Sequence, residues 1–367
     1  MLYMISFFSL KALLYQESFF YFLMNLNRKI LCFGAILVVF IFNYDLNAQT
    51  KDSNITIASS PLFNDPIHDG AADPVLIWNR QEKSWWMLYT ARRANMPTPD
   101  VSGYYGNKIG VASSDDHGKT WPFRGYLDLE FERGWNTFWA PDVVYDNGKY
   151  HMFVVYIKGV RNHWEGEAKI LYYTSENLWD WSYQNVLKLS SDRVIDASLF
   201  KTKKGIWKMW YKDNSNKGNI MMSESSDLVN WNTSKKPTIP GGAQEGPKIF
   251  EFKGYYWMLA DEWQGMRIYR SKDLEIWEKQ GLILDSASNR KDDGPSGAHG
   301  DVLVFDDIAY IFYFTHPGRK SHLKTEASNS FYDNHRTAIQ VAPLTFEGGT
   351  LKSNREEPFN YWLPEGK

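Results

Sequence analysis

The stretch SSDLVNW, residues 225–231, carries the pattern that decides the fold. A serine opens this phrase, and a tryptophan closes it. The phrase has three further copies along the chain: SSDDHGKTW (113–121), SENLWDW (175–181) and SKDLEIW (271–277). The closing tryptophans are 60, 50 and 46 residues apart. Four copies in order at this spacing indicate a repeated structural unit.

Short aromatic runs accompany these phrases. They are WWMLY (85–89), YHMFVVY (150–156), WKMWY (207–211), YWMLA (256–260) and YIFYF (310–314). Such runs predict β-strands, and no long stretch shows a helical period of 3.6 residues. Repeats of this length with about four short strands each are typical of a β-propeller. We therefore expect an all-β, five-bladed β-propeller over residues 57–352 and a C-terminal tail at 353–367. A β-sandwich is the alternative, and the ordered repeats argue against it.

Composition excludes several classes of protein. The 41 Lys+Arg nearly balance the 43 Asp+Glu, which argues against a nucleic-acid binder. Cys32 is the single cysteine and lies in the N-terminal apolar run, so the mature chain is expected to have no disulfide, thiolate metal site or cysteine nucleophile. The 16% aromatic content suits β-structure and surfaces that face sugars.

The N-terminus resembles a processing segment. Two basic residues precede an apolar run of 13 residues at 30–42, and small residues follow near Ala48. This order predicts a signal peptide over residues 24–48, cleaved near Ala48, and export to the periplasm or the medium. Met24 would be a natural start, so residues 1–23 are interpreted as an upstream extension or a mis-called start. An N-terminal membrane anchor is the alternative, but the run is short for a span. We expect no stable membrane insertion of the mature chain.

The repeat also aligns candidate site residues. Counting back eleven residues from the first aromatic of each run, or twelve in the first repeat, gives Asp73, Trp139, Asp196, Glu245 and His299. In a propeller the innermost strands surround a central channel, so equivalent positions at their entrances converge. Three carboxylates around one funnel suit hydrolysis of a glycosidic bond. One carboxylic acid protonates the leaving oxygen, a second carboxylate activates water or attacks carbon, and a third can raise the pKa of the acid.

Four short motifs at these positions resemble the blade openings of glycoside hydrolase family 43. They are DPVLI (73–77), FWAPDVV (138–144), VIDASLF (194–200) and EGPKIF (245–250). The resemblance extends from about Ser60 to Leu351. It implies a five-bladed propeller that hydrolyses glycosides with inversion.

Carried over by motif, the resemblance implies one role for each acid. Asp73 would be the general base, Asp196 would orient the acid and raise its pKa, and Glu245 would be the general acid. An inverting mechanism requires the carboxyl groups of Asp73 and Glu245 to lie roughly 6.5–9.5 Å apart. Ala197 stands where the family usually has a proline, which suggests a divergent branch.

Further residues are candidates for substrate binding. Trp139 suits the pocket floor or the core, and Trp263 is a second aromatic candidate. Asp142 either binds substrate or closes the Ala-Pro turn. Arg92 follows the first aromatic run and would reach a carboxylate or sulfate on an acidic sugar, or else belong to a solvated loop.

His299 matches the fifth-blade histidine that, in many relatives, sits near a calcium ion or a water cluster. Calcium prefers oxygen ligands, so a hydrogen bond from His299 to a carboxylate or to substrate is an equal alternative. We expect that no cofactor is required and keep a structural or channel Ca²⁺ as an open alternative.

These observations predict an exported, exo-acting, inverting glycoside hydrolase that removes terminal sugars from a plant or algal polysaccharide or oligosaccharide. The resemblance suggests arabinofuranosidase, xylosidase or galactosidase activities without ranking them. Two alternatives remain: a non-catalytic carbohydrate-binding propeller, and a related glycosidase in which His299 is the acid. The expected partner is carbohydrate, and the sequence leaves the oligomeric state open.

Overall fold

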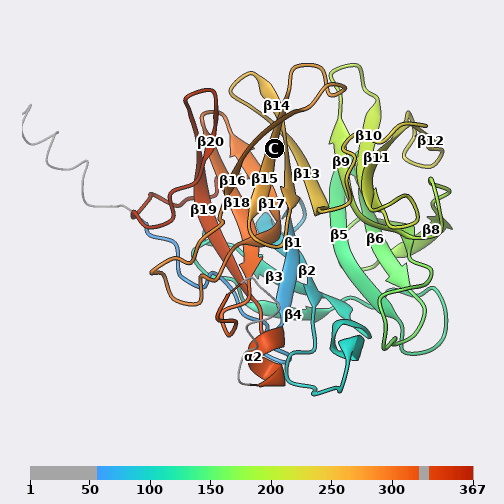
Figure 1. The fold of residues 1–367 in the computed structure, drawn as a ribbon, viewed down its shortest axis with the longest axis horizontal. Coiled ribbons are helices and arrows are strands. Elements are labelled where there is room, and N and C mark those ends of the chain that lie inside the picture. The colour runs from blue at the N-terminus through green and yellow to red at the C-terminus, as the bar shows by residue number, and fades with distance from the viewer. Residues whose placement is uncertain (1–55, 322–329, 367) are drawn as a thin grey trace, which may run out of the picture. The chain divides into compact units, whose positions relative to one another are not determined.

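The computed structural model describes residues 56–321 and 330–366, and these residues form a five-bladed β-propeller (Figure 1). Each blade within them is a four-stranded sheet whose neighbouring strands run antiparallel. The predicted fold class is therefore confirmed. The predicted extension at 1–23 and signal peptide at 24–48 lie outside the described residues. In the described part, no helix has the length and apolar character to span a membrane.

The blades follow one another along the chain. Blade 1 contains β1 (Ala71–Asn79), β2 (Ser84–Ala91), β3 (Lys108–Ser114) and β4 (Phe123–Tyr126). Blade 2 contains β5 (Thr137–Asp146), β6 (Lys149–Ile157), β7 (Lys169–Ser175) and β8 (Ser182–Val186). Blade 3 contains β9 (Val194–Lys201), β10 (Trp207–Asp213), β11 (Asn219–Ser225) and β12 (Asn232–Thr233). Blade 4 contains β13 (Glu245–Phe252), β14 (Tyr255–Asp261), β15 (Met266–Ser271) and β16 (Glu278–Ile283). Blade 5 contains β17 (Ala298–Phe305), β18 (Ile308–Thr315), β19 (Ala338–Glu347) and β20 (Thr350–Lys352). Two short helices, η1 (Val101–Tyr104) and α2 (Phe331–His335), lie in connecting loops.

The predicted aromatic runs form the second strand of each blade. Every residue of β2 and of β10 is buried, whereas no residue of the outer strand β8 is. A second strand is buried on both faces because its sheet packs between the two neighbouring sheets of the ring. Trp86, Trp210 and Trp257 are among the largest fully buried side chains. The aromatic content is thus used mainly to fill the space between blades.

The repeated serine-to-tryptophan phrase forms the turn between the third and fourth strands of a blade. In blade 3 the Ser225 hydroxyl accepts a hydrogen bond from the N–H of Leu228 at 2.9 Å, and the Asp227 carboxylate accepts one from Val229 at 2.9 Å. The indole of Trp231 then donates to the carbonyl of Leu228 at 3.1 Å. The serine and carboxylate or amide contacts recur in blades 2 and 4. Because these contacts are local, the turn can be recognised in the sequence.

The ring closes between blades 5 and 1. The innermost strands contact one another in the order β1, β5, β9, β13 and β17, and β17 contacts β1 again (Figure 1). Phe63, ahead of blade 1, pairs with Ile339 of β19 in blade 5. Tyr361 and Leu363 are buried in the core cluster that blades 1 and 5 share. The predicted tail therefore packs against the propeller through these residues.

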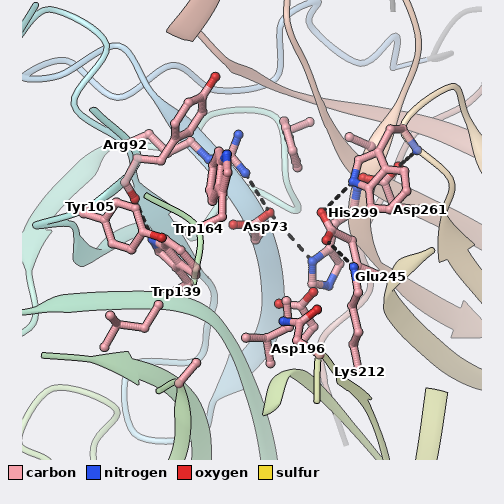
Figure 2. A pocket seen from close by; sticks show the side chains of 18 of the residues that line it. Asp73, Arg92, Tyr105, Trp139, Trp164, Asp196, Lys212, Glu245, Asp261 and His299 are labelled. Atoms are coloured by element: carbon pink, nitrogen blue, oxygen red, sulfur yellow. Dashed lines mark hydrogen bonds and ion pairs between the residues drawn. The ribbon is translucent and has the colours of Figure 1, made fainter. Parts of the chain in front are cut away.

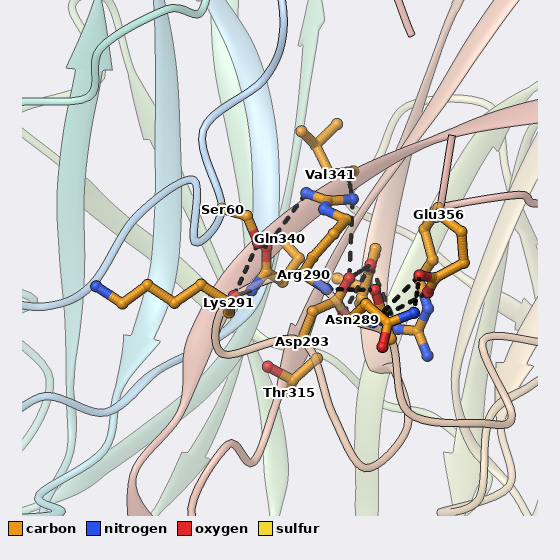
Figure 3. A network of polar contacts seen from close by, with 12 residues as sticks. Ser60, Asn289, Arg290, Lys291, Asp293, Thr315, Gln340, Val341 and Glu356 are labelled. Carbon is orange, nitrogen blue, oxygen red and sulfur yellow. Dashed lines mark hydrogen bonds and ion pairs between the residues drawn. The ribbon is translucent and has the colours of Figure 1, made fainter. Parts of the chain in front are cut away.

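A polar network ties the loop before β17 to the third strand of blade 5 (Figure 3). The buried carboxylate of Asp293 pairs with Arg355 at 2.7 Å and lies 3.7 Å from Arg290. Arg290 also donates to the carbonyl of Val341 in β19 at 2.8 Å. These bonds fix the loop that continues to Ser296, a residue of the pocket wall.

Candidate active site

A cavity of about 430 Å³ lies where the innermost strands of all five blades converge. Its wall includes four carboxylates: Asp73 of blade 1, Asp196 of blade 3, and Glu245 and Asp261 of blade 4 (Figure 2). The sequence analysis places the first three of them in one funnel, and the structure brings them together. The fourth, Asp261, was not predicted.

A backbone irregularity presents these side chains to the axis. In every blade the pairing between the first two strands shifts register near the strand entrance. Asp73 and Asp196 occupy the bulge with φ of +49° and +59°, in the left-handed region. A residue other than glycine costs about 1 kcal/mol or more there, and such strain is concentrated at functional sites. Asp196 adopts this conformation although Ala197 replaces the proline expected after it.

The count of eleven residues is off by one position in blades 2 and 4. Glu245 pairs with Asp261 and Trp139 with Val155, so both precede the bulge residue of their strand. The left-handed bulge positions there are Ala140 and Gly246. The count is inexact because the distance from the first aromatic residue back to the bulge differs between blades. It is eleven residues from Trp207 to Asp196 but ten from Tyr256 to Gly246. The acids still converge, because Asp73, Asp196 and Glu245 all line the same cavity.

Asp73 is buried beside two nitrogen-bearing side chains. Its Oδ1 atom lies 3.4 Å from Nη2 of Arg92 and 3.7 Å from Nδ1 of His299, and the exposed fraction of its side chain is 9%. Figure 2 shows the His299 ring between Asp73 and Glu245. The sequence left His299 either near a calcium ion or bonded to a carboxylate or substrate, and the structure shows it next to the carboxylate of Asp73.

Asp196 is buried deeper in the pocket. Its carboxylate accepts a hydrogen bond from the N–H of Gly246 at 3.1 Å. Burial raises the pKa of Asp196 to about 7, and the negative charges of Glu245 and Asp73 add to this rise, whereas His299 and Lys212 oppose it. At neutral pH this carboxyl group is thus poised between its protonated and ionised forms.

Glu245 is the most open of the three predicted acids, with 30% of its side chain exposed. It pairs with Lys212 at 3.2 Å and accepts a hydrogen bond from the indole of Trp263 at 2.9 Å. Burial raises the pKa of Glu245, but the charge of Lys212 and the Trp263 bond outweigh burial and hold it below the usual value. Burial thus raises the pKa of Asp196, whereas Lys212 and Trp263 lower that of the neighbouring Glu245.

Asp261 and Lys212 are the functional candidates that sequence reasoning missed. Asp261 accepts hydrogen bonds from the N–H groups of Trp263 at 2.6 Å and His299 at 3.0 Å. Burial raises the pKa of Asp261 to about 7, with the charge of Glu245 adding to the rise. Both are buried charged residues near the end of a second strand. Charged residues are seldom buried unless they have a partner, so an acid or base that follows an aromatic run is a signal the sequence does carry.

Aromatic side chains also line the cavity. Trp139 lies in the wall, where its indole donates to the carbonyl of Tyr104 at 2.8 Å and its ring contacts Tyr105. Trp164 and Trp263 are about half exposed, with 53% and 46% of their surface accessible. The placement of Trp139 and Trp263 in the wall agrees with their selection as candidates for substrate contact.

Asp142, in contrast, lies outside the pocket wall. Its Oδ2 accepts the N–H of Leu199 at 2.7 Å, and its Oδ1 lies 3.0 Å from Nζ of Lys248. Lys248 also pairs with Asp301 at 2.8 Å, and the two acids raise its pKa. Both oxygens of Asp142 are therefore engaged in joining inner strands. Of the two roles left open for Asp142, these contacts favour the structural one.

The described residues do not fit a calcium site near His299. They contain no group of three or more His, Cys, Asp and Glu side chains arranged to hold a metal ion. Calcium takes about 6–8 oxygen ligands, whereas Asp73, the acid next to His299, is already paired with the guanidinium of Arg92.

Comparison with known proteins gives a consistent result. Residues 122–262 match the model of the family described as Glycosyl hydrolases family 43. No curated protein matches the sequence. Among solved structures, a thermostable family-43 glycoside hydrolase is 19% identical with a TM-score of 0.59, covering 83% of this chain and 99% of its own.

Two further structures bear names that state their activities. A family 43 β-1,3-galactosidase with galactodeoxynojirimycin is 15% identical with a TM-score of 0.60, covering 83% of this chain and 100% of its own. A β-xylosidase/α-arabinofuranosidase from a compost microbial metagenome, in complex with xylotriose and described as a calcium-free form, is 15% identical with a TM-score of 0.57. It covers 81% of this chain and 97% of its own. At these identities, the structures show that the fold is shared.

Proposed function

We propose that this chain, whose residues 122–262 match the family 43 glycoside hydrolases, removes terminal sugars from a polysaccharide or oligosaccharide by inverting hydrolysis. The observation that carries the proposal is the meeting of Asp73, Asp196 and Glu245 in one cavity of about 430 Å³. Small-molecule pockets have volumes of roughly 300–1,000 Å³.

The burial of the acids supports different roles for them. Asp73, with only 9% of its side chain exposed, is suited to hold a water molecule against the far side of the anomeric carbon. Glu245, with 30% exposed, is better placed to reach an oxygen that departs toward solvent. We assign Asp73 as general base and Glu245 as general acid.

The proposed reaction is a single displacement. Water attacks the anomeric carbon and gives a proton to Asp73, while the carbon–oxygen bond to the leaving group breaks. The leaving oxygen takes the bond's electron pair and the proton of Glu245. The released sugar has the opposite anomeric configuration, and proton exchange with solvent then restores both carboxyl groups.

Glu245 must carry a proton when this step begins. Lys212 and Trp263 favour its ionised form, while burial raises the pKa of Asp196. We propose that a bound sugar weakens the Lys212 contact and so moves the shared proton from Asp196 to Glu245. Asp196 would then act on Glu245 through charge, because two neighbouring carboxylates resist being ionised together.

Exo action is supported by aromatic side chains in the cavity wall. Trp164, in the loop between β6 and β7, and Trp263, after β14, both line the cavity and leave much of their rings exposed. Indole faces bind sugar rings well. We propose that they hold the chain end whose last sugar enters the pocket.

The substrate class and the location of the enzyme are proposals as well. The two neighbours named above are described as acting on galactosides and on xylosides or arabinofuranosides. We propose a plant or algal glycan with such terminal sugars, met outside the cytoplasm after removal of the predicted signal peptide.

One comparison of variants tests the assignment of the acid. Glu245→Gln should abolish hydrolysis of a natural oligosaccharide but spare more activity on an aryl glycoside, whose leaving group needs little protonation. His299→Ala should retain Glu245-dependent activity on the natural substrate. If Glu245→Gln keeps full activity there while His299→Ala loses it, His299 is the acid. A protein that binds oligosaccharides but releases no sugar from any of them would be the non-catalytic propeller.

A further inference from the structure

The cavity wall is rich in positive charge. It includes five basic side chains that bear a fixed or strongly basic charge: Arg92, Arg161, Arg193, Lys212 and Arg319. Lys212 is paired with Glu245 and Arg92 with Asp73. Arg161, Arg193 and Arg319 form no ion pair with any residue in the described ranges. Burial raises the pKa of the other two acids, Asp196 and Asp261, and so favours their uncharged forms.

Among these cations, Arg319 has only neutral hydrogen-bond partners in the described chain. Its Nε donates to the carbonyl of Asn334 at 2.9 Å, and its Nη2 donates to the hydroxyl of Tyr104 at 3.1 Å. Both partners are neutral. Burial and the nearby charge of Arg92 lower the pKa of Arg319. A partly buried guanidinium next to a like charge is unfavourable unless an anion joins it.

Arg92 completes the same corner of the pocket. Its guanidinium packs over the ring of Phe314, with 4.5 Å between the charge centre and the ring centroid. It also approaches the ring of Tyr104 at 5.9 Å. Aromatic faces hold a guanidinium in a fixed plane, which suits it to bind a flat or tetrahedral oxyanion through two N–H groups. Figure 2 shows Arg92 extending toward Asp73 within the pocket.

His316 adds an independent observation at this corner. It lines the cavity, and its Nδ1 atom is buried without a hydrogen-bond partner among the described residues. Burial and the charges of Arg319 and Arg92 lower its pKa far below the usual value. A buried polar atom without a partner is unfavourable, and a ligand with a donor or acceptor group would satisfy it.

We propose that the sugar bound in this pocket carries an anionic group, a carboxylate or a sulfate, held between Arg92 and Arg319 beside His316. This inference rests on the proposed function, because it names the substrate class of the same pocket. Arg92 then lies between the anion and Asp73 and screens the general base from the substrate's charge. A neutral sugar would leave Arg319 without an ion pair among the described residues, with the charge of Asp261 as the nearby negative charge that raises its pKa.

Binding of matched monosaccharides tests the proposal. The pairs are galactose with galacturonate, glucose with glucuronate, and galactose with galactose 6-sulfate, titrated calorimetrically into full-length Glu245→Gln protein. In at least one pair the acidic member should bind about tenfold more tightly than the neutral one, or better. The preference should weaken at roughly 0.3 M salt. The uronates and the sulfate ester distinguish the two sources of the anion.

Three variants locate the effect. Arg319→Gln should abolish the preference, and Arg319→Lys should retain part of it, because lysine keeps the charge but not the fork of donors. Arg161→Gln removes the same charge from another part of the wall and should preserve most of the preference. Equal losses in Arg161→Gln and Arg319→Gln would refute a site at this corner. If Arg319→Gln fails to fold, the sugar pairs titrated into the Glu245→Gln protein with Arg319 intact, and into the Arg319→Lys variant, still test the proposal.

The outcome is separable from that of the proposed function. Equal binding of neutral and acidic sugars in all three pairs overturns the anionic substrate, while hydrolysis of neutral oligosaccharides would keep the glycosidase proposal. Selective binding of an acidic sugar by a protein that hydrolyses no glycoside would support the anionic ligand and overturn the glycosidase proposal.

Discussion

Asp261 lies directly across the β13–β14 pair from Glu245, and the two carboxylates share one partner residue. The Asp261 carboxylate accepts the backbone N–H of Trp263, while the indole of Trp263 donates to Glu245. Trp263 adopts a left-handed φ of +61° in this arrangement. Asp261 thus positions the group that stabilises the ionised form of the proposed general acid.

The raised pKa of Asp261 predicts a pH-dependent stability. A carboxyl group whose pKa is raised in the folded protein, here from 3.8 to about 7, destabilises the fold when it ionises. The contribution of Asp261 therefore decreases as the pH rises from about 4 to about 7. In urea unfolding at several pH values, Asp261→Asn should lose less stability over this window than the wild type.

Glu262→Gln is the matched control for this experiment. Glu262 is the next residue, but it pairs with Arg267 at 2.7 Å, and this hydrogen bond lowers its pKa. Ionised Glu262 therefore stabilises the fold, and this stabilisation is lost as the pH falls. A wild-type-like slope in Asp261→Asn would contradict the raised pKa.

Replacement of Lys212 should shift the pH profile of hydrolysis. The charge of Lys212 holds down the pKa of Glu245, so Lys212→Met should let Glu245 keep its proton to higher pH. The alkaline limb of kcat/KM should move upward, because a general acid must be protonated to act. Lys208→Met is the control: Lys208 lies in the same strand but pairs with Glu224 and Glu275. An unchanged limb in Lys212→Met would remove Lys212 from the mechanism.

Gly246 should not tolerate a side chain. Its φ is +56°, and an added Cβ atom would collide with the His299 ring. Gly246→Ala should cost roughly 1–3 kcal/mol of stability and lower kcat/KM by displacing His299 from Asp73. Gly254→Ala carries similar strain, with φ of +75°, but its Cβ would meet open space. If both variants behave alike in unfolding and kinetics, the contact with His299 has no importance.

The serine of the repeated phrase should contribute measurably to stability. Ser225→Ala removes the acceptor for the N–H of Leu228 and should cost about 1 kcal/mol in chemical unfolding, as loss of a helix cap does. Activity per folded molecule should stay unchanged, because the turn lies away from the pocket wall. The neighbouring exposed Ser226 provides the control, and its alanine variant should unfold like the wild type.

The sequence predicts the propeller because its signals are local. The turn of Ser225 and Trp231 is stabilised within seven residues, so its contacts leave a recognisable pattern. Short motifs contain the three predicted acids: Asp73 and Asp196 occupy bulges, and Glu245 precedes one. These motifs can be found without knowledge of the packing.

The missed and misassigned residues depend on packing between blades. Lys212 reaches Glu245 only because blade 3 packs beside blade 4. Asp142 meets Lys248, 106 positions further along the chain, near the axis. Equal counting along the chain reached Glu245, one position before the bulge, because the distance from the first aromatic residue to the bulge varies from blade to blade. Such distances are set by the closed ring and are not encoded within a single repeat.

The bulges give this fold a modular architecture. In the described chain, each of the five inner strands offers one such position at the mouth of the channel, and only two of them carry an acid. Ala140 already has the left-handed φ of +41° that Asp73 and Asp196 adopt. The same bulge conformation thus presents an aspartate, an alanine or a glycine at equivalent points of four inner strands, with the scaffold unchanged.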